Sequence, residues 1–334
     1  MPTIMTVQAA IWKTVIEEMR RDPTIFIFGW MCGGAADTGG TIVGYNAKAV
    51  IEEFGRTRIS YTGICETQEA GSGIGAALTG TRPIVDFSFS DFALDAWGQI
   101  ALQAPKMRFK LGYQSECPVI FAMTIGGYDT SGSVHHYGTY HNWLANSPSM
   151  FVVIPTTPAD AVGLWRTALR VTKDPTVMIL DRKTAPMRGP VPDGDYTIPF
   201  GKADVKREGK DVTIAATGYW VSVAVEAAND LAQEGISAEV WDPRTLMPFD
   251  RKSLLASVSK TGALVAVDQA PKSFGTTGEF MATVGEALTP VPPMARVASM
   301  DSPVSWSNPL ELYVLPSKAK IIKAAREVIG RKRG

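Results

Sequence analysis

Short apolar runs of strand length alternate with helix-length segments along most of this chain, and this alternation limits the folds open to it. In the first half the runs lie at 24–28, 59–64, 83–87, 119–124, 151–154 and 176–180. Apolar residues recur at helical spacing over 5–20, and a Thr-Pro-Ala-Asp sequence opens a helix at 157. Strand and helix in alternation, with short connections, predict a mostly parallel sheet that helices cover on both faces.

A stretch dense in Pro and Gly, residues 185–203, interrupts this pattern. After it the alternation restarts, with strands expected at 211–217, 237–242, 263–268 and 295–298, and helices at 220–234, 250–259, 276–288 and 317–329. The sequence therefore predicts a doubly wound α/β domain over residues 1–190, a linker over 191–204 and a smaller α/β domain over 205–334.

Charge and cysteine usage exclude several classes of protein. The chain has 33 Lys and Arg against 33 Asp and Glu, so it lacks the basic excess of a nucleic-acid binder. Its three cysteines form no CxxC pair, which argues against a disulfide framework or a zinc site and favours a reducing, cytoplasmic location. The chain has no signal-peptide pattern at its start and no apolar run of 18 residues, so no membrane span is expected.

The segment 59–80 joins an apolar run, one acid and a helix poor in side chains. Glu66 follows the run, and Gly and Ala fill positions 71, 73, 75, 76 and 77. Glu66 could simply be an acid favoured by the helix dipole. Its place between strand and helix, where α/β proteins carry their chemistry, suggests a function instead. The bare helix face can accept another helix or a flat cofactor at close range, and of these we expect a helix of a neighbouring subunit.

The same glycines offer a rival interpretation as a dinucleotide fingerprint. Gly71, Gly73 and Ala76 match GxGxxA, and Asp86 at the end of the next strand could bind a ribose. That fingerprint needs its first glycine directly after the strand, so that the pyrophosphate lies on the helix N-terminus. Here the six residues CETQEA intervene, which weakens a nicotinamide oxidoreductase as the function.

All three histidines, His135, His136 and His141, fall within seven residues of one loop rich in Gly, Ser and Tyr. Histidine is the commonest general acid or base near neutral pH, so catalysis or substrate contact is one interpretation. A surface loop is a second. A metal site is a third, although the spacing matches no zinc motif and no Cys is near.

An aromatic segment, DFSFSDF, lies at 86–92. Phe87 and Phe89 alternate as in a strand with one buried face. Phe92 is out of phase with them, where the strand gives way to a helix expected to run to about residue 109, and an aromatic ring there could stack on a flat ligand.

Taken together, these segments resemble a known family. The matching strings are ISYTGICETQEAGSGIGAALTGTRPIVDFSFSDFALDAWGQI, APKMRF, HHYGTYHNWLANSPSMFVVIPTTPADA and DPRTLMPFD, in order and nearly end to end. They are similar to the beta subunit of the thiamine diphosphate-dependent decarboxylating component of 2-oxo acid dehydrogenases, whose members act on pyruvate, branched-chain 2-oxo acids or acetoin. The resemblance implies a transketolase-like pyrimidine-binding domain followed by a transketolase C-terminal domain.

The resemblance also implies roles for single residues. Glu66 would hydrogen-bond a ring nitrogen of the cofactor's aminopyrimidine and so activate it. Phe92 would stack against that ring, and Ile64 and Phe89 would line the same pocket. His136 would act at the substrate end, on the substrate carboxylate, on a tetrahedral intermediate or in transfer of the acyl group to lipoamide.

The motif that holds the cofactor's diphosphate and Mg²⁺ is missing. The family of thiamine enzymes uses Gly-Asp-Gly followed by Asn, whereas Asp193-Gly194-Asp195 is the nearest string here and lies in the predicted linker. We therefore expect no metal site in this chain. The resemblance implies an alpha subunit that holds the diphosphate and Mg²⁺, a heterotetramer of two alpha and two beta chains, and a lipoyl acyltransferase as a further partner.

Several positions depart from the family pattern near the substrate end. Met123 stands where relatives have Arg, His135 where they have Gln, and Tyr137-Gly138 where they have Ser-Gln. Gly29-Trp30-Met31 replaces Gly-Glu-Asp. These changes favour a 2-oxo acid, diketone or acyloin other than pyruvate. The C-terminal subunit of a two-chain transketolase is the nearest alternative, because Gly63-Ile64-Cys65-Glu66 resembles its Gly-Ile-Ala-Glu, and a non-catalytic scaffold subunit is another.

Overall fold

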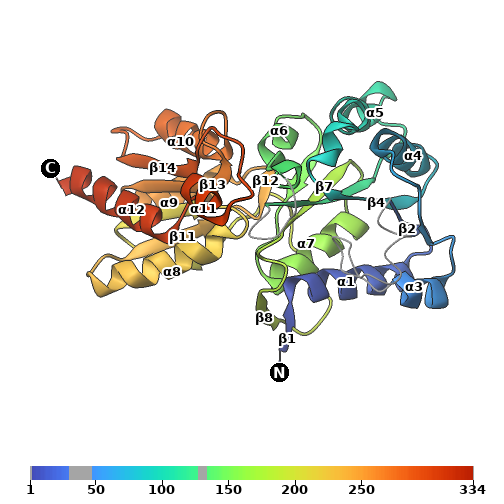
Figure 1. The fold of residues 1–334 in the computed structure, drawn as a ribbon, viewed down its shortest axis with the longest axis horizontal. Coiled ribbons are helices and arrows are strands. Elements are labelled where there is room, and N and C mark those ends of the chain that lie inside the picture. Colours follow the sequence, from blue (N-terminus) through green and yellow to red (C-terminus); the bar gives the residue numbers. More distant parts are fainter. Residues whose placement is uncertain (1, 30–46, 127–133, 334) are drawn as a thin grey trace. The chain divides into compact units, whose positions relative to one another are not determined.

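The structure, a computed structural model, describes residues 2–29, 47–126 and 134–333. Contacts between residues divide the chain into two compact units, each an α/β structure in which helices flank a sheet (Figure 1). The first unit comprises Met1–Ile125 and Trp143–Phe200, and the second comprises Gly126–Asn142 and Gly201–Gly334. The segment that carries the three histidines, 134–142 (the histidine segment), therefore groups with the second unit. The sequence predicts it within the first domain.

Six strands of the first unit lie in one sheet in the order β6-β7-β5-β4-β2-β3. They are β2 (Ile25–Phe28), β3 (Ile59–Ser60), β4 (Arg82–Phe89), β5 (Ile120–Ile125), β6 (Phe151–Val153) and β7 (Thr176–Asp181). All pairings between these six strands are parallel. Parallel neighbours need crossover connections, which the intervening helices supply, and the predicted doubly wound sheet is confirmed.

The helices of the first unit include two long ones that pack against each other. They are α1 (Val7–Arg21), α3 (Ala47–Phe54), α4 (Glu66–Leu78), α5 (Ala104–Lys110), α6 (His141–Ala145, whose first two residues belong to the second unit) and α7 (Pro158–Arg170). Helix α7 begins as predicted, because the Thr157 side chain accepts a hydrogen bond from the Asp160 amide at 3.1 Å. Arg170 on α7 binds the buried carboxylate of Glu18 on α1, at 2.5 and 2.8 Å.

One prediction for the first unit is wrong in detail, and one pair of strands was not predicted. The single helix expected after Phe92 consists of a 3₁₀ turn (Phe92–Leu94), a π-helical stretch (Gly98–Gln103) and α5. Pro105 at the start of α5 has no amide hydrogen to donate to the preceding turn, which interrupts the regular helix there. In addition, β1 (Thr3–Thr6) and β8 (Arg188–Val191) form an antiparallel ribbon that periodicity did not reveal.

The second unit has a sheet of its own, in the order β14-β13-β10-β11-β9. Its strands are β9 (Asp204–Arg207), β10 (Val212–Ala216), β11 (Ala238–Asp242), β13 (Leu264–Pro271) and β14 (Met294–Ser299). Its helices include α8 (Trp220–Gln233), α9 (Arg251–Thr261), α10 (Thr276–Ala287), α11 (Asn308–Val314) and α12 (Lys318–Arg333). The predicted second domain contained neither β9, which pairs antiparallel to β11, nor α11, nor the short strand β12 (Thr245–Met247).

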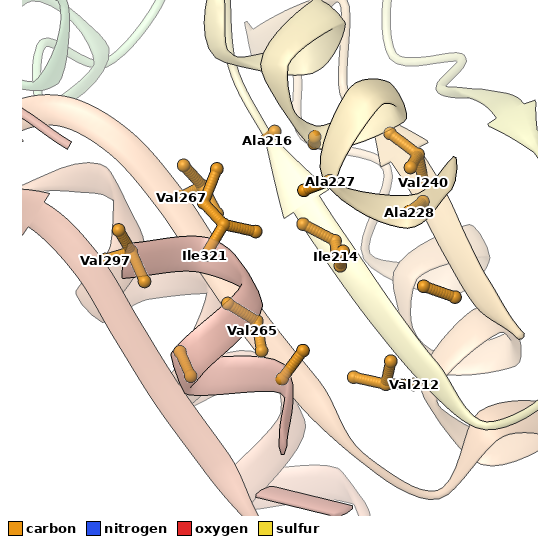
Figure 2. Close-up of a cluster of buried hydrophobic side chains, with 14 of the residues drawn as sticks. Val212, Ile214, Ala216, Ala227, Ala228, Val240, Val265, Val267, Val297 and Ile321 are labelled. Atoms are coloured by element: carbon orange, nitrogen blue, oxygen red, sulfur yellow. The ribbon is translucent and has the colours of Figure 1, made fainter. Parts of the chain in front are cut away.

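The core of the second unit lies between one face of this sheet and two helices (Figure 2). Val212, Ile214 and Ala216 alternate along β10 and so point to the same face. Ala227 and Ala228 of α8 and Ile321 of α12 cover them. Small residues on α8 let that helix lie close to the strands, and burying this apolar face is what holds the unit together.

Candidate functional site

Helix α4 begins at Glu66, directly after the loop that follows β3, the edge strand of the first sheet. The predicted strand 59–64 is only two residues long, because β3 is the edge strand and pairs with β2 at Ile59 and Ser60 alone. Beyond that point Tyr61 and Ile64 are 57% and 73% exposed. The apolar side chain of Ile64 is thus presented to its surroundings and not buried in the sheet.

The carboxylate of Glu66 is largely shielded from solvent at the start of α4. The residue is 7% exposed, and the helix N-terminus favours its negative charge. Among the described residues, no hydrogen bond or ion pair engages its side chain. Glu69, one turn later, differs, because the Thr62 hydroxyl donates to its carboxylate at 2.5 Å. Glu66 is therefore the acid of this helix that remains able to bind a ligand.

One hydrogen bond holds the start of α4 against the segment that carries Phe92. Thr67 Oγ1 donates to the Asp95 carbonyl oxygen at 2.5 Å. Near it the two segments approach closely, because a Cβ added to Gly71 would lie 3.7 Å from the Gln99 side chain. Phe92 opens the 3₁₀ turn just before Asp95. The structure thus holds the segments of Glu66 and Phe92 together within the first unit, far apart as they are in sequence.

Phe89 and Phe92 form an aromatic pair beside this junction. Their ring centroids are 5.7 Å apart with the planes nearly perpendicular, and the Arg182 guanidinium lies 5.2 Å from the centre of the Phe89 ring. Phe89 therefore packs against both Phe92 and Arg182. Among the predicted pocket residues it supports Phe92, whose ring is only partly buried.

The dinucleotide interpretation does not fit this geometry. Gly71, Gly73 and Ala76 lie inside α4 and not in the turn before it. A Cβ on Gly73 would lie 2.5 Å from Val85 Cγ2, so this glycine lets α4 pack on its own sheet. Asp86 is fully buried and accepts a hydrogen bond from the Ser88 amide. The glycine pattern is thus a packing feature, and for Gly73 the expected contact with another subunit is wrong.

His135 and His136 lie together in a 3₁₀ turn, Val134–His136, of the second unit. Their ring centroids are 4.4 Å apart, and His136 is partly buried whereas His135 is exposed. The Gly126 amide donates to the Gly138 carbonyl at 3.4 Å, which closes the base of this loop. The positions 127–133 of the loop, like Trp30, Met31 and the Gly-rich stretch 32–45, lie outside the described residues.

His141 is fully buried and pairs with an acid that sequence reasoning missed. Its Nε2 lies 2.9 Å from Oδ2 of Asp268 on β13, and both residues are at most 1% exposed. Burial by itself would raise the pKa of Asp268, but the charge of His141 and the hydrogen bonds from His141 and Thr217 hold that pKa below its usual value. The signal in the sequence is a lone acid in an apolar strand, LVAVDQAP, where acids are rare.

At two of the positions that depart from the family pattern, the side chain is buried. Met123 in the middle of β5 is fully buried, and Tyr137 is 6% exposed. Met123 can therefore act on substrate choice only through the residues packed on it, whereas Tyr137 is about as shielded as Glu66.

The Asp193-Gly194-Asp195 string follows β8, where the structure gives it a structural role. Asp195 binds Arg170 at 2.6 Å and Arg21 at 3.3 Å, and the hydrogen bond from Arg170 holds its pKa below the usual range. Within the described ranges, no group of three or more His, Cys, Asp or Glu residues could hold a metal ion. A search of the described helices for a membrane-crossing segment, long and apolar throughout, found none.

Comparison with known families matches both halves of the chain. Residues 4–187 match the family described as transketolase, pyrimidine binding domain, and residues 201–321 match transketolase, C-terminal domain. A solved split-gene transketolase, described as an inactive beta4 tetramer, superposes with a TM-score of 0.79 at 23% identity, over 98% of this chain and 99% of that one. The likeness to that structure shows the fold.

Curated relatives match along the whole length. The 2-oxoisovalerate dehydrogenase subunit beta of Bacillus subtilis is 36% identical over 98% of this chain and 99% of its own. From the same organism, acetoin:2,6-dichlorophenolindophenol oxidoreductase subunit beta is 34% identical (99% and 98% covered), and pyruvate dehydrogenase E1 component subunit beta is 33% identical (97% and 98% covered). The chain therefore belongs to the transketolase-like family of these dehydrogenase beta subunits, in which a pyrimidine-binding domain precedes a transketolase C-terminal domain.

Proposed function

We propose that this chain is the beta subunit of a thiamine diphosphate-dependent enzyme that acts on a 2-oxo acid, an acyloin or a diketone. The enzyme cleaves the bond next to the carbonyl and passes the acyl group to lipoamide or another acceptor. The observation that carries this proposal is Glu66, a shielded carboxylate without a partner among the described residues, at the start of α4. The full-length match to beta subunits with these substrates supports it.

When bound, thiamine diphosphate supplies a carbon nucleophile for the substrate carbonyl. Glu66 holds and shares a proton with a ring nitrogen of the aminopyrimidine, a role that suits a carboxylate shielded from water. Ile64 offers an exposed apolar surface, and the partly buried ring of Phe92 offers a face for stacking, with Phe89 behind it. These residues fit the pyrimidine end of the cofactor. In the second unit, His136 acts at the substrate end.

The diphosphate and Mg²⁺ are held by an alpha subunit. This proposal is supported by the engagement of Asp195 with arginines, which leaves the chain's nearest diphosphate-like string in a structural role. The assembly is a cytoplasmic heterotetramer of two alpha and two beta chains, with a lipoyl acyltransferase as a further partner. The substrate is small, and neither nucleic acid nor membrane is a partner.

The split cofactor site is tested by titration. The chain is titrated with thiamine diphosphate and Mg²⁺ alone and together with a candidate alpha subunit, by calorimetry. We expect binding only in the presence of the alpha subunit. Tight binding by the lone chain would disprove the division of the site.

The substrate class is tested with 2,6-dichlorophenolindophenol as the electron acceptor, so that no acyltransferase is required. Acetoin, diacetyl, branched-chain 2-oxo acids and pyruvate are compared with xylulose phosphate. Turnover of an acyloin, a diketone or a 2-oxo acid other than pyruvate is expected. Turnover of xylulose phosphate instead would establish the two-chain transketolase alternative.

A further inference from the structure

The end of the histidine segment is tied to the sheet of the second unit by a buried, hydrogen-bonded pair of side chains. His141 follows His136 by five residues, and its Nε2 meets Asp268 Oδ2 at 2.9 Å. The other carboxylate oxygen, Oδ1, accepts from the Thr217 hydroxyl at 2.6 Å and from the Gln269 amide at 2.8 Å. Asp268 is thus held in place by strand β13 and by the residue that follows β10, which gives His141 a fixed partner.

The next residue makes a second connection to the same region. Asn142 Nδ2 donates to the Phe274 carbonyl at 2.9 Å, in the turn between β13 and α10. The Gly126 amide also bonds the Gly138 carbonyl, at 3.4 Å. The backbone that follows His136 is therefore restrained at two points, Gly138 and His141–Asn142, and the restraint at His141–Asn142 has the shorter hydrogen bonds.

A buried polar pair is a poor source of stability, because the desolvation of its two members offsets most of their attraction. An apolar pair of the same size would hold the fold together as well. What a buried pair can add is one defined geometry, since a buried polar group without its partner is costly in any other arrangement. The His141–Asp268 pair is therefore suited to fixing the position of a segment.

We propose that His141 is a positioning residue that, through Asp268, sets the segment carrying His136 for its work at the substrate end. The functional part of this inference rests on the role proposed above for His136. The anchoring part does not, and the two parts are tested by separate measurements on the full chain.

Anchoring is measured by hydrogen–deuterium exchange in the peptide that covers 134–142. His141→Phe keeps the ring shape and removes the donor, whereas His141→Gln keeps an Nε2 donor. The matched control is Glu239→Gln, which removes another buried carboxylate charge of the same sheet, one that Ser257 and Lys260 bind. We expect at least tenfold faster exchange in His141→Phe, near wild-type exchange in His141→Gln, and no change at 134–142 in the control. Equal exchange in all variants would overturn the anchoring.

The link to His136 is measured by a double-mutant cycle in the complex with the alpha subunit. His141→Phe is expected to lower kcat at least tenfold in the wild-type background, with unchanged affinity for thiamine diphosphate. In a His136→Gln background the same change should cost less than threefold, because residues that act as one unit are not additive. A full additional loss there would overturn the positioning role. Wild-type activity of His136→Gln itself would instead refute the proposed role of His136. The hydrogen–deuterium exchange experiment would still test whether His141 restrains the segment.

Discussion

Thr67 donates a hydrogen bond through its hydroxyl to the carbonyl oxygen of Asp95 at 2.5 Å. This bond joins the first turn of α4 to the 3₁₀ turn that opens with Phe92. The bond between these neighbouring residues thus brings the acid and the aromatic residue proposed to hold one flat ring to the same part of the first unit.

Replacement of Glu66 is expected to abolish thiamine-dependent activity without loss of the fold. Glu66→Gln keeps the size of the side chain and removes its ability to exchange a proton. General acid–base groups typically contribute about 10²–10⁴-fold, so a fall in kcat of at least about 100-fold is predicted. Steady-state kinetics of the alpha–beta complex measure it. The matched control is Glu286→Gln on the exposed side of α10, which should match wild type. Survival of activity in Glu66→Gln would show that the assigned role is wrong.

The thiol of Cys65 is expected to report occupancy of the cofactor site. Cys65 lies between Ile64 and Glu66 and is exposed, whereas Cys117 is fully buried. Of these two described cysteines, alkylation with iodoacetamide, mapped by peptide mass spectrometry, should modify Cys65 first and Cys117 only on unfolding. Thiamine diphosphate with Mg²⁺ should slow the modification of Cys65 in the alpha–beta complex relative to the same complex without cofactor. An unchanged rate would argue that the pyrimidine binds elsewhere.

The buried Cys117 makes the stability of the protein depend on alkaline pH. Burial raises the pKa of its thiol from 9.0 to about 11. As pH rises, the unfolded chain therefore releases this proton before the folded chain does. The free energy of unfolding is unaffected by this thiol below pH 9 and falls between pH 9 and 11. The loss amounts to at most about 3 kcal/mol.

Cys117→Ala isolates this effect. In chemical denaturation, the free energy of unfolding of the wild type should fall relative to that of the variant as pH rises from 9 to 11. A difference independent of pH would contradict the assignment, because the other ionisable groups titrate in both proteins alike.

Two glycines of α4 should respond in opposite directions to the same change. A Cβ on Gly73 would lie 2.5 Å from Val85 Cγ2, whereas a Cβ on Gly75 has no atom within 4 Å. Gly73→Ala is expected to destabilise the chain by about 1–3 kcal/mol through overpacking. Gly75→Ala is expected to stabilise it by about 0.5–1 kcal/mol, because alanine loses less entropy than glycine in a helix. Urea denaturation of the two variants distinguishes them.

Gly75 also tests the expectation that this helix face meets another subunit. Sedimentation of Gly75→Ala with the alpha subunit should show weaker assembly, although the chain alone is more stable. Assembly equal to wild type would place the interface away from Gly75.

Much of the fold was readable from local patterns. Strand-length apolar runs and helical spacing located most strands and helices of both sheets, and the Thr157-Pro158 start of α7 is confirmed in its capping contact. The extent of β3 was misjudged because a strand ends where its neighbour ends. Residues 61–64 have no partner strand with which to form ladder hydrogen bonds. The short strands β1, β8 and β9 were missed because four residues carry too little periodicity to detect.

The sequence by itself determined the fold class and the family, together with the candidates Glu66, Phe92 and His136, since these depend on residue type and order. Only the tertiary structure decided which residues far apart in the sequence lie next to one another. It turned Gly73 toward Val85, packed Phe89 against Arg182, and paired His141 with Asp268 across 127 positions of the chain. Local pattern carries no information about such pairings, because they depend on how parallel strands are ordered in a sheet. That order is set when the apolar faces of all the strands and helices are buried together.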